Sequence, residues 1–473
     1  MAIVIPPATS SFSSTGISYN RKYIYIISAI AALGGLLFGF DLVIISGTVQ
    51  FFSDFFHLTE LEKGWAVGCI NLGCAIGALA AGKLSDTLGR KKLLMLCALL
   101  FAITGFGTGW APSFTSFIIF RMIGGVAVGT AALVCPMYIA EIAPAPLRGR
   151  LVTFYQLAIT TGILLAYLSN YSLLNTGENN WRWMFSSQLA PALLFFFGLF
   201  LVAESPRWLI RKMRDKEAEV VLARIGGSAY AHEEGDAIRK SFAHEVKENF
   251  RDLFMKKMML VVLIGVMIAI FSQAGGQNSL FSYAPEIFKQ AGMGEDSAFL
   301  QSVILGLINF IFTFVAIATI DKVGRRKLLL VGSALLCVDA LALAAAFYFQ
   351  LDGVWILAFV LGFIAIYAAT LGPVTWVALS EIFPNRIRGY ALSIATLALW
   401  IANFITTASF PVMKANFGLP ITFAIHAAIC FIYLVFIFFK VPETKGKSLE
   451  EIELQLTGKK NKTNKPHAVP EVL

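Results

Sequence analysis

Long apolar runs restrict the fold of this sequence more than any other feature. A helix of roughly 20 apolar residues crosses the ~30 Å hydrocarbon core of a bilayer, and the chain of 473 residues contains twelve such runs. A soluble protein is excluded, because 57% of the residues are hydrophobic and only 14% are charged. We predict an all-α membrane protein with twelve transmembrane helices. The predicted spans are residues 24–47, 64–84, 93–111, 115–138, 152–171, 183–203, 257–280, 299–320, 328–349, 354–380, 390–412 and 419–440.

The sequence contains no pattern that is typical of a metal site or a catalytic site. All six cysteines fall inside the predicted spans, where cysteine behaves as a small hydrophobic residue and not as part of a disulfide or metal site. The sequence shows no metal-ligand spacing, no phosphate-binding loop and no nucleophile with a base beside it. We therefore expect no bound metal, no cofactor and no enzymatic activity.

Basic residues are concentrated in the loops on one side of the predicted bundle. The loops of this side contain Arg90, Lys91, Lys92, Arg148, Arg150, Arg325, Arg326, Lys327, Arg386 and Arg388. The short loops of the other side contain Lys63, Arg182, Lys289 and Lys414. Because cytoplasmic loops carry the excess of Lys and Arg, we predict a multi-pass protein of the cell inner (plasma) membrane with both termini cytoplasmic. The formal charge of +9 then reflects topology and not binding to nucleic acid.

The second half of the sequence repeats the first. The sequence DTLGR at 86–90 recurs as DKVGR at 321–325, and the acid Glu141 recurs as Glu381. We infer two six-helix bundles that are duplicated in parallel. The predicted divisions are a cytoplasmic N-terminal segment at 1–23, an N-terminal six-helix bundle at 24–203, a cytoplasmic linker at 204–256, a C-terminal six-helix bundle at 257–440 and a cytoplasmic C-terminal tail at 441–473.

The linker at 204–256 has a charge-rich helical pattern that is interrupted at Gly226 and Gly227. We predict a few short helices that lie on the cytoplasmic face. A solvated connector is the simpler role for this segment, and a latch that contacts both halves is the alternative. The polar end of the tail, GKKNKTNKPHAVPEVL, is typical of disorder.

Four loop motifs identify a family that the sequence resembles. They are GKLSDTLGRKK at 82–92, ESPRW at 204–208, DKVGRRK at 321–327 and PETKG at 442–446. These motifs resemble the signatures of the sugar porters of the major facilitator superfamily, and the chain resembles in particular the bacterial proton-coupled sugar symporters of the xylose–proton type. The resemblance implies the major facilitator fold and transport by alternating access.

The resemblance also implies that charged loop residues form cytoplasmic ion-pair networks, which hold the inner gate in one state. The residues at matching positions are Asp86, Arg90, Glu141, Arg148, Glu204, Asp321, Arg325, Glu381, Arg388 and Glu443. For any one of them, a helix cap or a charge that only sets the topology is the alternative.

Two ionisable residues lie inside the apolar runs of the first half. Asp41 lies in the first run and Arg121 in the fourth. A charge within the bilayer costs ~2.5–3.5 kcal/mol on insertion scales, so it needs a partner, a proton or a water-filled cavity. Each residue lies about two turns from the outer end of its predicted span, so the two can meet at one depth. We interpret them as a proton-coupling pair, because movement of the arginine changes the affinity of the carboxylate for a proton. The resemblance supports this role, since proton-coupled members carry an acid at the matching position. A buried pair that only fixes helix packing is the alternative.

Amide side chains interrupt the seventh apolar run around Gly275 and Gly276. Amides offer donors and acceptors to sugar hydroxyls, and a glycine pair lets a helix break where it lines a cavity. The resemblance extends the predicted substrate-binding set to Gln156, Gln273, Gln277, Asn278, Asn309, Trp376, Trp400 and Asn403. Family members have polar groups at the positions of Ile163 and Leu399, which favours a less polar or differently oriented sugar here. Helix packing is the alternative for the tryptophans and for the amides.

These features predict a secondary active transporter of a monosaccharide that works by sugar/proton symport. We expect the sugar, the proton and the lipid bilayer as partners, and a monomeric chain. A facilitative uniporter, a drug exporter and a non-transporting sugar sensor that keeps the transporter fold are the alternatives. The presence of both Asp41 and Arg121 favours coupled flux, because a sensor does not need a titratable carboxylate.

Overall fold

The computed structural model describes residues 18–243, 250–384, 386–447 and 451–452. These residues form helices and connecting loops, without a strand among them. The predicted N-terminal segment up to residue 17 and the predicted tail from residue 453 lie outside the described residues.

The helices follow the two predicted halves and the linker between them. The first half contains α1 (Arg21–Ile44), η1 (Ile45–Gly47), α2 (Val49–Phe56), α3 (Glu60–Leu88), α4 (Arg90–Gly109), α5 (Phe114–Ile142), α6 (Ala145–Leu173), α7 (Asn180–Ser186), α8 (Leu189–Gly198) and η2 (Leu199–Leu201). The linker contains α9 (Pro206–Arg211), α10 (Asp215–Ala243) and η3 (Phe250–Phe254). The second half contains α11 (Lys256–Ala274), α12 (Gln277–Gln290), α13 (Glu295–Val323), α14 (Arg325–Tyr348), α15 (Gly353–Ala369), α16 (Leu371–Ile382) and α17 (Arg388–Lys440).

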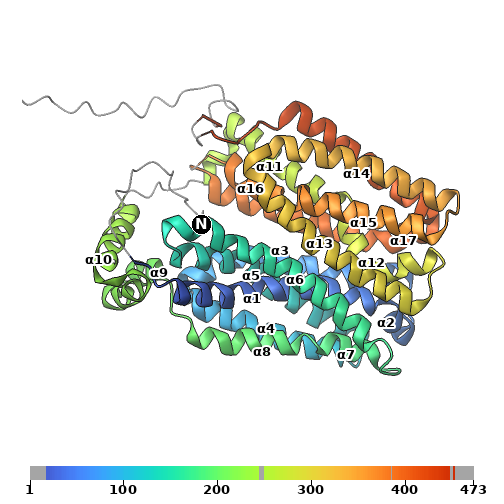
Figure 1. Cartoon of the computed structure of the whole chain (residues 1–473), viewed down its shortest axis with the longest axis horizontal. Coiled ribbons are helices and arrows are strands. Elements are labelled where there is room, and N and C mark those ends of the chain that lie inside the picture. Colours follow the sequence, from blue (N-terminus) through green and yellow to red (C-terminus); the bar gives the residue numbers. More distant parts are fainter. Residues whose placement is uncertain (1–17, 244–249, 385, 448–450, 453–473) are drawn as a thin grey trace, which may run out of the picture.

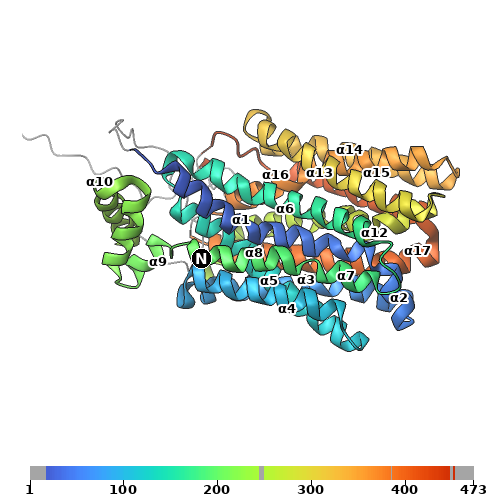
Figure 2. The ribbon, with the colours of Figure 1, turned by 60° about the horizontal axis from the view of Figure 1, so that its bottom comes forward.

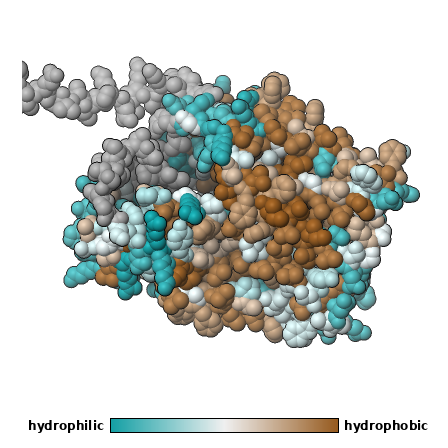
Figure 3. All heavy atoms as spheres, viewed as in Figure 1, coloured by the Kyte–Doolittle hydropathy of each residue, from teal (hydrophilic) through white to brown (hydrophobic). Residues whose placement is uncertain are grey.

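The membrane-spanning helices agree with the predicted spans. Eleven helical stretches of the described chain are long and apolar enough to cross a membrane. The last of them, α17, has 53 residues and is interrupted at Gly418, whose φ is 74°. It therefore contains the last two predicted spans, and the prediction of twelve spans is confirmed. On the face shown in Figure 3, an apolar band lies between two polar ends. The chain is a multi-pass membrane protein.

The two halves form separate bundles that lie side by side (Figure 1). We call one end of the molecule the linker end, because it carries α9, α10 and the loops at 86–90 and 321–325. The other end, which carries α2 and the beginning of α3, is called the opposite end (Figure 2).

An ion-pair cluster lies at the linker end of the first half. Arg90 pairs with Glu141 at 2.8 Å and with Asp86 at 3.4 Å. Glu204 Oε1 accepts hydrogen bonds from the backbone N–H groups of Arg90 at 2.9 Å and of Lys91 at 3.2 Å, so the carboxylate caps the first turn of α4. Burial raises the pKa of Glu204, although these backbone N–H groups lower it in part.

The second half repeats this cluster. Arg325 pairs with Glu381 and with Asp321, both at 3.0 Å. Glu443 Oε1 accepts a hydrogen bond from the backbone N–H of Arg325 at 3.0 Å and caps α14 in the same way. The repeat predicted from the sequence is therefore present in side-chain contacts, and in each cluster the arginine and its two ion-pair partners belong to one half.

Two of the predicted network residues make a different contact. Arg148 Nη2 donates to the carbonyl of Ala143 at 3.4 Å, and Arg388 Nε donates to the carbonyl of Phe383 at 3.1 Å. Ala143 and Phe383 terminate α5 and α16, so each arginine caps the end of the preceding helix. Their role in a gate network stays a prediction.

The linker contacts both halves, as the latch alternative requires. Gly227 breaks α10 with a φ of 84°, which confirms the predicted interruption. Trp208 Nε1 of α9 donates a hydrogen bond to the carbonyl of Asp86 in the first half at 3.0 Å. Asp252 of η3 pairs with Arg386 in the loop between α16 and α17.

The Glu204 cap generates a stability prediction. Glu204→Ala should reduce the free energy of unfolding by about 1–2 kcal/mol, because the N–H groups of α4 lose their acceptor. Glu204→Gln keeps an acceptor and should lose less than half of that amount. Thermal unfolding in detergent micelles measures both values. Glu217→Ala is the control, since this exposed acid pairs with Arg214 on the linker surface; equal melting temperatures for Glu204→Ala and the unmodified protein contradict the cap.

Candidate functional site

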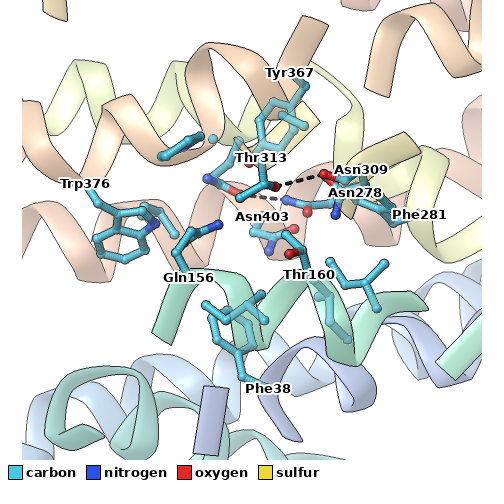
Figure 4. Close-up of a pocket in the computed structure, with 18 of the residues that line it drawn as sticks. Phe38, Gln156, Thr160, Asn278, Phe281, Asn309, Thr313, Tyr367, Trp376 and Asn403 are labelled. Atoms are coloured by element: carbon cyan, nitrogen blue, oxygen red, sulfur yellow. Dashed lines mark hydrogen bonds between the residues drawn. The ribbon is translucent and has the colours of Figure 1, made fainter. Parts of the chain in front are cut away.

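A cavity lies between the two halves (Figure 4). Its polar lining consists of Gln156, Thr160, Gln273, Asn278, Asn309, Thr313 and Asn403. Its aromatic lining consists of Phe38, Phe281, Tyr367, Trp376 and Trp400. The structure thus brings seven of the eight predicted substrate-binding residues to one cavity. Their role in binding stays a prediction.

A helix break positions two of the amides. Gln273 lies in the last turn of α11 and Asn278 in the first turn of α12. Gly276 between them has a φ of 99°, and a Cβ there would lie 2.8 Å from the ring of His426, so only glycine fits. Asn278 Nδ2 donates to Gln273 Oε1 at 2.6 Å. The break therefore presents a joined pair of amides to the cavity.

Gln277 is the predicted binding residue that the structure places elsewhere. Its side chain is buried, and its Nε2 donates to the carbonyl of Ser272 at 2.6 Å. It is absent from the cavity lining of the described chain. The reason is the helix break itself, because the last turn of α11 exposes backbone carbonyls that need a donor, and Gln277 supplies one. In this conformation Gln277 supports the break and does not face the cavity.

Some polar atoms of the cavity keep hydrogen-bonding capacity. Trp400 Nε1 and Asn403 Oδ1 are buried and have no hydrogen-bond partner within the described part of the chain. Ile163 and Leu399 also line the cavity, at the two positions where the resemblance expects polar groups. One wall can therefore bind hydroxyl groups, and another part of the lining offers only apolar contact.

The predicted set omits several further lining residues, among them Thr160, Thr313, Tyr367 and Phe38. Thr160 and Thr313 lie one helical turn after Gln156 and Asn309, so the helical period could have found them. Tyr367 lies at the far side of the cavity from Phe38 (Figure 4). No motif in the sequence marks this tyrosine, because its position depends on how α15 packs.

Asp41 and Arg121 meet as predicted. Asp41 Oδ1 lies 2.6 Å from Arg121 Nη1, and the two side chains are 5% and 2% exposed. Arg121 Nε and Nη2 have no hydrogen-bond partner within the described residues. A pair joined through one nitrogen lacks the second hydrogen bond of a bidentate arginine–carboxylate pair. Fewer hydrogen bonds are therefore lost when the two side chains separate.

The ion pair and the cavity share helix α1. Phe38 and Leu42 of α1 line the cavity, while Asp41 of the same helix contacts α5. The ring of Phe38 also lies 5.9 Å from that of Trp400 in the second half. A movement of α1 therefore alters the cavity wall and the ion pair together.

The halves are in close contact at the opposite end. A Cβ on Gly64 of α3 would lie 2.0 Å from the carbonyl oxygen of Ala408 in α17, so the two backbones touch. Asn71 Nδ2 donates to Thr407 Oγ1 at 3.3 Å, also across the two halves.

At the linker end, a second cavity lies between the halves. Asp86 and Met137 line it from the first half, and Tyr390 and Leu397 line it from the second. Together with the contacts at the opposite end, this cavity describes a conformation that is closed at the opposite end and open at the linker end.

Comparison with known proteins identifies the family. Residues 27–456 match the family model described as Sugar (and other) transporter. The chain belongs to this transporter family. It is 41% identical to the D-xylose-proton symporter of Escherichia coli (strain K12), over 92% of this chain and 96% of that protein. It is 39% identical to the arabinose-proton symporter of Bacillus subtilis (strain 168), again over 92% and 96%. The family and these relatives are transporters and not enzymes.

Solved structures of a sugar transporter share the fold. The inward open conformation of the xylose transporter from E. coli aligns with a TM-score of 0.83 and 39% identity, over 91% of this chain and 99% of that chain. The proton:xylose symporter of the major facilitator superfamily with bound 6-bromo-6-deoxy-D-glucose aligns with a TM-score of 0.78 and 40% identity, over 93% and 100%. The major facilitator fold is therefore confirmed for this transporter.

His426 yields a stability prediction. Its Nδ1 lies 3.2 Å from the carbonyl oxygen of Ala274 at the end of α11, where it can donate in the Nδ1–H tautomer. His426→Phe should lower the free energy of unfolding by about 1–3 kcal/mol, because this buried carbonyl loses its donor. His426→Asn places an amide nitrogen near the position of Nδ1 and should retain most of the stability, whereas His426→Gln should not. Thermal unfolding of the purified variants measures these losses of stability. Equal losses for His426→Asn and His426→Phe contradict a hydrogen bond from Nδ1 to the Ala274 carbonyl.

Proposed function

We propose that this chain is a monosaccharide–proton symporter that works by alternating access. The observation that carries the proposal is the sharing of α1 by a polar, aromatic-lined cavity and a buried carboxylate–arginine pair. The relatives named as xylose–proton and arabinose–proton symporters, at 41% and 39% identity, support the same chemistry.

The cavity supports a sugar as substrate. The joined amides of Gln273 and Asn278, with Asn403, offer donors and acceptors to hydroxyl groups, and the faces of Trp376 and Trp400 suit the C–H surface of a sugar ring. Because four of the five amides that line the cavity, Gln273, Asn278, Asn309 and Asn403, belong to the second half, we propose a monosaccharide most of whose hydroxyl groups are directed towards the second half.

The Asp41–Arg121 pair supports a coupled proton. A buried carboxylate keeps its charge while the arginine is close, and it takes up a proton when the arginine withdraws. One proton that moves through ~100 mV supplies ~2.3 kcal/mol, enough for roughly fifty-fold accumulation of a neutral sugar. Rearrangement of α1 around the substrate is the proposed link between the two steps.

The proposal also assigns the two ends of the protein to the two sides of the membrane. The linker end carries most of the loop arginines and lysines, which supports a cytoplasmic location for this end in an inner (plasma) membrane. The conformation is then inward-facing. We propose that Arg148 and Arg388 leave their helix-capping contacts and join acids of the other half when the linker end closes, while the Arg90 and Arg325 clusters persist as rigid units. The chain acts as a monomer in the lipid bilayer in this proposal.

An uptake screen tests the function directly. Proteoliposomes that contain the full chain should accumulate one or a few sugars from a panel of pentoses, hexoses and polyols, and only when a pH gradient drives protons inward. Equilibration without accumulation indicates a uniporter. Specific sugar binding without any flux indicates a sensor.

Replacement of the carboxylate isolates the coupling step. Asp41→Asn should abolish accumulation of sugar against its gradient, yet leave counterflow of pre-loaded sugar, because exchange needs no net proton movement. Asp54→Asn removes the charge of an exposed acid in α2 and should behave like the unmodified protein. Accumulation by Asp41→Asn at the unmodified level removes the proton role of Asp41.

Truncation of the cavity wall tests the binding site. Gln273→Ala and Trp376→Ala should each weaken sugar binding by at least ~1 kcal/mol, about fivefold in Kd, through loss of a hydrogen bond or of a ring contact. Trp355→Ala removes an exposed tryptophan of α15 and serves as the control. Isothermal titration of the purified variants gives the Kd values, and an unchanged Kd excludes the residue from the site.

A further inference from the structure

A proline in α12 leaves one carbonyl without its usual helical donor. Pro285 has no backbone N–H, so the carbonyl of Phe281, four residues earlier, cannot form the standard helical bond. Tyr167 of α6 donates its hydroxyl hydrogen to this oxygen at 2.8 Å. Tyr167 is 1% exposed and Phe281 is 3% exposed, so the bond lies in the protein interior.

This bond crosses from one half of the protein to the other. Tyr167 belongs to the first half, and Phe281 and Pro285 belong to the second. The ring of Tyr167 also lies against Gly306 of α13, where a Cβ would lie 2.9 Å from Cδ2. The tyrosine thus contacts two helices of the second half on the side of the cavity that is closed in this conformation.

A second tyrosine of the opposite end makes the same kind of bond. Pro411 of α17 leaves the carbonyl of Thr407 without a helical donor. Tyr283 of α12 donates to that oxygen at 3.1 Å. Proline in a membrane helix is tolerated where neighbouring side chains satisfy the freed carbonyl. The Tyr283 bond stays inside the second half, so only the Tyr167 bond depends on the approach of the two halves.

We propose that the Tyr167 hydroxyl is a gating contact for the opposite end of the protein. The bond to the Phe281 carbonyl forms when the halves close there, and it must break when they separate, leaving the carbonyl to water in the opened cavity. Tyr167 then stabilises the inward-facing conformation relative to the outward-facing one. This inference rests on the proposed alternating-access function and assigns Tyr167 as a positioning residue for that cycle.

The distance between the halves tests the contact. Spin labels on cysteines at Leu61 of α3 and Val354 of α15 report it, because both positions are exposed, by 71% and 74%, and lie at the opposite end in different halves. The half-buried Cys337 is replaced by serine in every sample. Double electron–electron resonance on the full chain in lipid nanodiscs, without sugar, gives the ratio of open to closed populations.

Tyr167→Phe should raise the ratio of open to closed populations about fivefold, the change that loss of one buried hydrogen bond produces. Tyr138→Phe is the matched control. Tyr138 is also buried and donates to a backbone carbonyl, that of Ala203 at 2.7 Å, but both residues belong to the first half. Its removal should leave the ratio unchanged. An unchanged ratio in Tyr167→Phe, or an equal rise in Tyr138→Phe, overturns the proposal.

A proline replacement tests the chemical origin of the contact. Pro285→Ala restores the backbone N–H that can bond the Phe281 carbonyl inside α12. In that background Tyr167→Phe should change the ratio less than twofold, since the carbonyl keeps a donor when the halves separate. If Tyr167→Phe still changes the ratio fivefold in the Pro285→Ala background, the missing N–H of Pro285 is not the reason that the Phe281 carbonyl needs Tyr167.

The test is independent of the proposed function. The population ratio is measured without sugar or a proton gradient, so failure of the unmodified chain to take up sugar contradicts the function and leaves this comparison intact. Conversely, if the unmodified chain takes up sugar and Tyr167→Phe leaves the ratio unchanged, the gating role of Tyr167 is contradicted and the proposed function is not.

Discussion

The need to satisfy every backbone polar group inside the membrane governs this structure. Hydrocarbon offers no water to a carbonyl that loses its helical donor, so a helix can break only where a side chain or another helix replaces the bond. In this chain the substitutes are identifiable. Gln277 and His426 bond carbonyls at the end of α11, and Tyr167 and Tyr283 bond carbonyls freed by prolines. Each break therefore carries its own stabilising contact.

The same breaks create the cavity and its closure. The break between α11 and α12 turns Gln273 and Asn278 towards the cavity, where a continuous helix would distribute them around its surface. A few residues further along α12, the carbonyl of Phe281 meets Tyr167 of the other half. The cavity-facing amide Asn278 and a contact between the halves thus lie on one short helix, α12. A ligand that orders the amides also acts on the position of α12, which provides a physical route from binding to the contact between the halves.

The parts of the structure that the sequence predicts are those set by local pattern. Apolar length placed the twelve spans, and equal depth in the membrane was enough to pair Asp41 with Arg121. The orientation of Gln277 could not be predicted, because it depends on which carbonyls the break exposes. Tyr367 was missed because the packing of α15, and not a motif, brings it to the cavity. The open linker end was also beyond reach, since it depends on the balance of weak contacts between halves and not on the helices themselves.

The ion pair and the cavity are only partly divided between the two halves. The ion pair lies wholly in the first half, between α1 and α5, and most of the cavity lining comes from the second. Yet Gln156 and Phe38 bring the first half to the cavity wall, and Phe38 contacts Trp400 across it. Phe38 and Asp41 are less than one turn apart on α1. A shift of α1 that moves Phe38 around a ligand in the cavity therefore also moves Asp41. Coupling between sugar and proton then requires only the rigidity of a single helix, and no longer chain of contacts.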